Sequence, residues 1–302
     1  MLQKKLLLLC CVWLGLANNL MAQQVTDTTD LLGKLEKETT QNTTNYTTAT
    51  FKTTRLVDGH TVETLGKGVL DVKISHRFGT LSNGAYELFG LDNATMRLGF
   101  DYGITKYLMV GIGRSTYQKT FDAFFKIKLL RQSTGKNNVP VTVSYVPTIA
   151  LKTLRPDDPN RKNFFSSRLS YTQQLIIARK FSEKTSLQLM PTFIHRNLAP
   201  LATDPNDIWA IGIGGRQKLT KRISFNAEYY YLLPGSKTAG TTNALSMGFD
   251  IETGGHVFQL HFTNSRAMTE KNFISETTGK WEKGDILFGF NISRVFNIGK
   301  HH

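Results

Sequence analysis

Histidines are the residues of this sequence that could most readily act as general bases in catalysis. His76, His195, His256 and His261 fall in four different segments of the chain. The sequence contains neither a Gly-x-Ser-x-Gly nucleophile elbow nor a His-Glu-x-x-His zinc motif. A general base must also lie within hydrogen-bond reach of a reacting group, and no spacing here brings such a group to a histidine. We therefore expect no enzyme activity, no cofactor and no metal site.

A second set of polar residues is charged, and its members recur at alternate positions of apolar segments. Basic and acidic members share one face, so they can pair with each other or select a solute by its charge. Seven bases stand against five acids, which leaves too small an excess to predict a strong anion preference. The set comprises Asp71, Lys73, Arg77, Arg97, Asp101, Asp122, Lys126, Lys128, Arg168, Arg216, Glu228 and Asp250, with His261 on the same face.

The elements that carry these residues are predicted to be β-strands. Near the C-terminus, Ile286, Phe288, Phe290 and Ile292 alternate with the small and polar residues of 285–293. An alternation with period two gives a strand two chemically different faces. The same pattern occurs in twelve segments between residue 69 and residue 296, so the chain is predicted to be all-β.

A soluble barrel would turn its apolar face inward, whereas a transmembrane barrel turns that face to lipid. Three features favour the membrane. The polar faces are rich in Gly and Ser beside paired charges, aromatic residues gather near the strand ends, and short turns alternate with long links. We predict a transmembrane antiparallel up-and-down β-barrel of about twelve strands with a flexible N-terminal segment. Its apolar face contacts outer-membrane lipid, and both termini are periplasmic.

The N-terminus predicts export. Residues 1–22 combine Lys4 and Lys5 with a short apolar run and end in Ala22, as a secretory signal peptide does. Its removal would take away both cysteines, Cys10 and Cys11, and with them any disulfide. Residues 23–54 form a polar, threonine-rich periplasmic segment, and residues 55–302 form the barrel. The formal net charge of +14 is dispersed, so we expect no nucleic-acid partner.

Three stretches carry a resemblance to a known family. They are the residues 51–79, which contain FKTTRLVDGHTVETLGKGVLDVKISHRFG, the residues 89–103, FGLDNATMRLGFDYG, and the residues 110–119, VGIGRSTYQK. This sequence resembles the Bacteroidota β-barrel family called domain of unknown function 5777, from about Phe51 to the C-terminus. The resemblance implies an outer-membrane location and no established activity. The last strand also resembles the C-terminal signal read by the barrel assembly machinery, although six residues follow Phe296.

Two functions from different classes follow from this interpretation. The first is a narrow pore or transporter for a small solute, which the lumenal Arg and Lys residues could select. The alternative is a structural or partner-binding barrel whose lumen is occluded by ion pairs and by the N-terminal segment. An outer-membrane enzyme is a distant third.

Overall fold

The computed structural model describes residues 43–155, 164–254 and 256–299. The predicted signal peptide and most of the predicted polar segment lie outside these residues. The elements discussed here all belong to the unit Thr44–His302. No helix in the described part of the chain has the length and apolarity needed to cross a bilayer.

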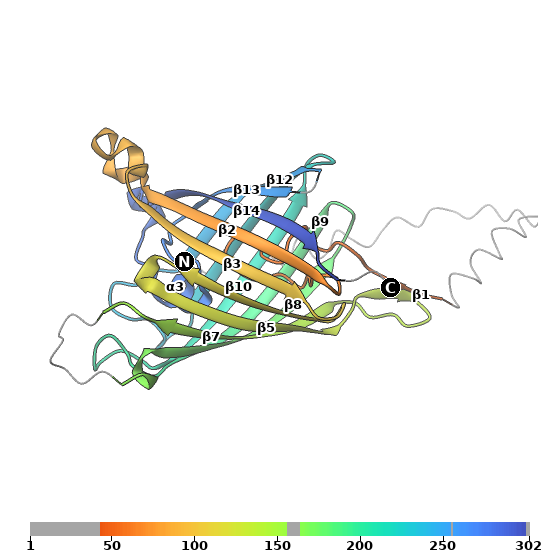
Figure 1. Cartoon of the computed structure of the whole chain (residues 1–302), viewed down its shortest axis with the longest axis horizontal. Coiled ribbons are helices and arrows are strands. Elements are labelled where there is room, and N and C mark those ends of the chain that lie inside the picture. The colour runs from red at the N-terminus through yellow and green to blue at the C-terminus, as the bar shows by residue number, and fades with distance from the viewer. Residues whose placement is uncertain (1–42, 156–163, 255, 300–302) are drawn as a thin grey trace, which may run out of the picture. The chain divides into compact units, whose positions relative to one another are not determined.

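Twelve antiparallel strands close into one barrel, as the alternation predicted (Figure 1). Each strand pairs with the next along the chain, and β14 pairs with β2 to close the sheet, with Ile292 opposite Ile74. The strands are β2 (Val69–Thr80), β3 (Ala94–Gly103), β4 (Leu108–Ser115), β5 (Thr120–Leu130), β7 (Thr142–Lys152), β8 (Leu169–Lys180), β9 (Thr185–Arg196), β10 (Asp207–Lys218), β11 (Ile223–Leu232), β12 (Ala244–Thr253), β13 (His256–Thr263) and β14 (Leu287–Asn297).

The two faces of the wall differ as the sequence predicted. In β2, Asp71, Lys73 and Arg77 are buried inside, while Ile74 is 39% exposed on the outside. In β14, Gly289, Asn291 and Ser293 are buried, and Phe288, Phe290 and Ile292 alternate with them. His76 lies on the outer face, where its ring stacks on that of Phe290 at a centroid distance of 5.0 Å. The apolar exterior therefore belongs to the sheet itself and requires an apolar surrounding.

The two ends of the barrel carry different connections. One end has turns of a few residues, together with the small sheet formed by β1 (Thr44–Tyr46) and β6 (Ser133–Gly135). The other end carries longer links, which hold η1 (Leu81–Asn83), η2 (Ala85–Gly90), η4 (Ser166–Arg168), α3 (Glu270–Ser275) and η5 (Trp281–Lys283), and one short link, 116–119, which holds η3 (Tyr117–Lys119). Figure 1 shows η1 and η2 projecting beyond the wall at this end. We call these the short-turn end and the long-loop end.

Candidate functional site

The wall pairs its own charges inside the lumen. Lys73 lies between two acids, with its Nζ 2.9 Å from Asp71 Oδ2 and 2.6 Å from Asp101 Oδ2. Arg97 holds Asp122 with two donors, and its Nε lies 2.9 Å from Asp122 Oδ1. These side chains come from β2, β3 and β5 and are all buried. Removing one partner of such a pair would leave a buried charge uncompensated, which is strongly destabilising.

Glycines make room for Arg97. Its guanidinium crosses Gly99 and Gly113 on the way to Asp122. A Cβ on Gly113 would lie 2.3 Å from Arg97 Nη2, and a Cβ on Gly99 would lie 2.7 Å from Nη1. Glycine inside a strand commonly marks such a close approach. Gly99 of β3 and Gly113 of β4 thus accommodate the Arg97 side chain.

A segment that we call the plug, residues 50–65, lies inside the lumen. The barrel was predicted to begin at residue 55, but the wall itself begins at Val69. Asp58, His60, Thr61 and Val62 of the plug are all buried. The predicted occluding segment, residues 23–54, thus overlaps the plug only at its C-terminal end. Twelve strands enclose more space than their own side chains fill, and the plug occupies it.

The plug is a tight hairpin around Asp58-Gly59. Leu56 N donates to Gly59 O at 2.8 Å, and Thr61 N donates to Thr54 O at 3.0 Å. Asp-Gly between β-branched and apolar residues is a hairpin signal. The sequence therefore indicates a turn at Asp58-Gly59, but it does not show that this turn lies inside the lumen. Gly59 is required by its surroundings, because a Cβ there would lie 2.0 Å from Tyr230 Oη.

The wall grips the turn of this hairpin through Glu228. Its carboxylate accepts hydrogen bonds from three successive backbone N–H groups, those of Val57 at 3.4 Å, Asp58 at 2.7 Å and Gly59 at 3.2 Å. Successive backbone N–H groups in a turn form an anion-binding concavity. Asp58 itself is held at 2.6 Å by Arg77 Nη2. One acid of the wall therefore binds the backbone, and one base binds the side chain.

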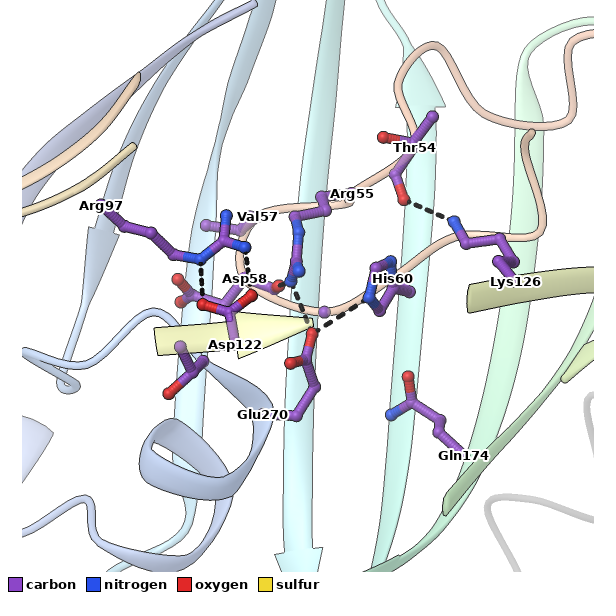
Figure 2. A network of polar contacts seen from close by, with 12 residues as sticks. Thr54, Arg55, Val57, Asp58, His60, Arg97, Asp122, Lys126, Gln174 and Glu270 are labelled. Atoms are coloured by element: carbon purple, nitrogen blue, oxygen red, sulfur yellow. Dashed lines mark hydrogen bonds and ion pairs between the residues drawn. The ribbon is translucent and has the colours of Figure 1, made fainter. Parts of the chain in front are cut away.

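Lys126 grips the stem of the hairpin. Its Nζ donates to the carbonyl oxygens of Thr54, Thr61 and Glu63 at 3.0, 2.9 and 3.0 Å. Figure 2 shows the ammonium reaching Thr54 from the strand beside the plug. An ammonium has three N–H donors, so these carbonyls use its full capacity. Three amides of the wall, on Gln188, Gln259 and Asn291, donate to other plug carbonyls at 2.9–3.0 Å.

Helix α3 meets the plug from the long-loop end. Its first residue, Glu270, accepts a hydrogen bond from Arg55 Nη1 at 2.6 Å, and its Oε1 lies 3.2 Å from His60 Nε2 (Figure 2). Burial first, and then the charges of Arg55 and Lys126, hold the pKa of His60 well below its usual value. His60 is therefore neutral at neutral pH, while Arg55 neutralises Glu270.

An apolar cluster completes the contact between plug and wall. Phe51, Leu56 and Val62 of the plug pack with inward-facing wall residues and with Phe273 and Ile274 of α3. Phe124, which broke the alternation of its segment, faces inward and contacts the His60 ring at 4.4 Å between centroids. The wall side of this cluster includes Met109, Phe124, Val146, Ile176, Met190, Ile194, Ile208 and Tyr230.

The remaining predicted residues do not all join this centre. Asp250 accepts from Gln259 Nε2 at 2.8 Å, and His261 is buried against Gly248 and Gly289. Lys128 is half-buried, with its Nζ 3.8 Å from Glu63 Oε2. Two arginines lie at opposite ends: Arg168 belongs to η4 rather than to a strand, and Arg216 lines a cavity among the short turns. The alternation in the sequence placed Arg168 on a strand. It could not show that η4 ends at Arg168 and that β8 begins only at the next residue, Leu169.

The plug and α3 lie between two cavities. The larger, about 950 Å³, is lined by residues of the long loops, by strand ends and by α3. The smaller, about 120 Å³, lies among the short turns and is lined by Ala49 and Lys52, next to and within the plug. Within the described residues, no group of three or more His, Cys, Asp or Glu side chains is placed to hold a metal ion.

The comparison with protein families agrees with the architecture. The family described as a membrane-bound beta barrel domain, DUF5777, matches residues 51–296. Among solved structures, the NanC porin is similar at 8% identity with a TM-score of 0.47, covering 76% of this chain and 100% of its own. The KdgM porin is similar at 10% identity with a TM-score of 0.43, covering 76% of this chain and 99% of its own. An outer membrane channel from Pseudomonas putida F1 is similar at 13% identity with a TM-score of 0.44, covering 78% of this chain and 98% of its own. No curated protein gives a significant match.

Proposed function

This chain belongs to the DUF5777 family of membrane-bound β-barrel domains, and we propose that it is a plugged pore for small hydrophilic solutes. The observation that carries this proposal is the plug between two cavities, one at each end of the lumen. Moving residues 50–65 would join the cavities without breaking the strand ladder, because the plug forms no part of the barrel sheet.

The contacts of the plug suit a segment that leaves and returns. Its backbone is bound by lumenal side chains such as Glu228, Lys126 and Gln188. Water can replace those partners one by one, whereas a ladder to another strand would be lost as a unit. The wall keeps its own ion pairs, such as Arg97–Asp122, when the plug is absent. A polar lumen would then remain for a hydrated solute.

The orientation in the membrane is part of the proposal. The twelve strands are even in number, so β2 begins and β14 ends at the short-turn end. Bacterial barrels place short turns in the periplasm and long loops outside. The long-loop end then faces the exterior of the outer membrane, and both termini are periplasmic. Phe296 near the end of β14 supports recognition by the barrel assembly machinery during insertion.

Conductance measurements test the proposal. The mature chain, refolded and inserted into a planar bilayer, is compared with a variant in which a Gly-Ser linker of equal length replaces residues 50–65. We expect rare openings from the native chain and steady conductance from the variant. Heat-modifiable electrophoretic mobility, which reports a closed barrel, shows that the variant has folded.

A second function has its own support. The plug is deeply buried and buries charged groups with it, such as Asp58 against Arg77. A permanently occluded barrel would serve as a structural or partner-binding protein and not as a catalyst. A variant that folds without the plug and still fails to conduct would favour this function over the pore.

A further inference from the structure

The larger cavity, which we call the vestibule, contains an arginine with unused donors. Arg196, at the end of β9, lines the vestibule and is only 1% exposed. Its Nη2 donates to Pro205 O at 2.7 Å and to Thr238 Oγ1 at 3.2 Å. Its Nε and Nη1 have no hydrogen-bond partner among the described residues. A buried charged donor without a partner is costly, so a partner from solution would stabilise it.

The charge of the vestibule points to an anionic partner. Among the described residues, four cations line it, on Lys152, Arg168, Arg196 and Lys271, against the single carboxylate of Glu276. That carboxylate is already engaged by Lys271 and by the amides of Asn272 and Gln118, at 2.7 and 2.9 Å. No carboxylate of the described residues lies within ion-pair distance of Lys152, Arg168 or Arg196. The vestibule therefore has positive charge that its own acids leave uncompensated.

The remaining lining suits a hydrophilic solute. Hydroxyl and amide groups of Ser167, Asn197, Thr238 and Thr241 surround the cations. The volume of about 950 Å³ lies near the upper end of the range found for small-molecule sites. A guanidinium offers parallel N–H donors that match the oxygens of a carboxylate or a phosphate.

We infer that the vestibule binds a small hydrophilic solute through its carboxylate or phosphate group, with Arg196 as the main contact. This inference rests on the proposed pore function, because it names the class of solute that would meet the plug from the long-loop end. Below the vestibule, Lys73 and Arg97 are paired with acids of the wall and Arg77 with Asp58 of the plug, so selection would occur first at this mouth.

Titration calorimetry of the refolded chain in detergent tests the inference with three probes. Glucuronate carries a carboxylate, glucose 6-phosphate carries a phosphate, and glucose carries neither. We expect one or both anions to bind and glucose to give no signal. Arg196→Gln should weaken binding about tenfold or more, which corresponds to about 1.4 kcal/mol. Arg196→Lys keeps the charge but loses the parallel N–H donors of the guanidinium, so its affinity for the anions should lie between those of the native chain and Arg196→Gln. Lys221→Gln removes one charge in an exposed turn at the opposite end and should bind like the native chain.

The outcomes separate this inference from the pore. Equal binding of glucose and the anions, no binding at all, or equal effects of Arg196→Gln and Lys221→Gln would overturn the vestibule site. None of these results bears on conductance through the plug-replaced variant. Conversely, Arg196-dependent anion binding by a chain that never conducts would retain the site and refute the pore.

Discussion

Lys126 and Lys128 project inward from the same strand, two residues apart, but only Lys126 is bound by the plug backbone. Lys126 is fully buried, and its Nζ donates to three plug carbonyls, including Thr61 O at 2.9 Å. Lys128 reaches only Glu63, with its Nζ 3.8 Å from Oε2. The two lysines form a matched pair, with the same side chain, strand and face and with different contacts to the plug.

Replacing Lys126 by Met should therefore release the plug. The substitution keeps most of the volume but leaves Thr61 O and Glu63 O without the ammonium donor and Thr54 O with Thr61 N alone, at a cost of about 3 kcal/mol. We expect a higher open probability in planar bilayers and faster proteolysis of residues 50–65. Lys128→Met should change both readouts little, because a partly exposed pair contributes little. Equal effects of the two substitutions would contradict the role given to Lys126.

Period-two alternation was enough to predict the wall. Asp71, Lys73 and Arg77 alternate with apolar residues in the sequence, which puts them on one face of the strand, and the features that favour a membrane barrel place that face in the lumen. It also predicted the pairing of the last strand with the first, because a sheet in lipid must close. The wall is predictable because the residue types on the two faces of each strand can be read from the sequence of that strand alone.

The plug was not predictable in the same way. Asp58-Gly59 announces a turn, but nothing near it in the sequence shows that Glu228, 169 residues from Gly59, would bind that turn. Inward-facing apolar residues on a polar face, such as Phe124 and Met109, were the visible signal that something packs inside the wall. Arg196 was missed because the apolar alternation stops before β9 ends. Contacts between a lumenal segment and a closed wall depend on the tertiary structure.

Gly113 should tolerate no larger residue. A Cβ there would lie 2.3 Å from Arg97 Nη2, so Gly113→Ala must displace the guanidinium that holds Asp122. We expect a loss of about 1–3 kcal/mol in the free energy of unfolding, measured by urea titration in detergent micelles. At Gly66 a Cβ would meet only the Val69 side chain at 3.5 Å. Gly66→Ala should therefore leave the urea midpoint close to the native value.

A charged residue on the outer face of β4 should impair folding only if lipid covers that face. Ile112 is 61% exposed near the middle of the strand. Lysine there would cost about 2–4 kcal/mol at the centre of a bilayer, so Ile112→Lys should fold poorly into lipid vesicles. Leu91 is 53% exposed but belongs to a link at the long-loop end. Leu91→Lys should fold normally, and a normal yield for Ile112→Lys would contradict the position of β4 in the membrane.

Acid should loosen the plug through His60. Its pKa is depressed in the folded chain by burial, and then by Arg55, Lys126, Lys73 and Arg97. Between that depressed pKa and the ordinary value of about 6.5, the unfolded or released plug binds more protons. Stability is thus complete above about pH 6.5 and falls by up to about 1.4 kcal/mol per unit below it.

Conductance measured from pH 7.5 to 5.0 should therefore rise on acidification in the native chain. His60→Gln, which cannot protonate, should flatten the part of this rise that His60 causes. His195→Gln alters an exposed histidine beside Asp207 and should leave the rise intact. Glu270 lies 3.2 Å from His60 Nε2 and would stabilise the protonated ring only if Arg55 released it. A pH profile that is identical in the native chain and in His60→Gln would show that the plug opens, if it does, through another group.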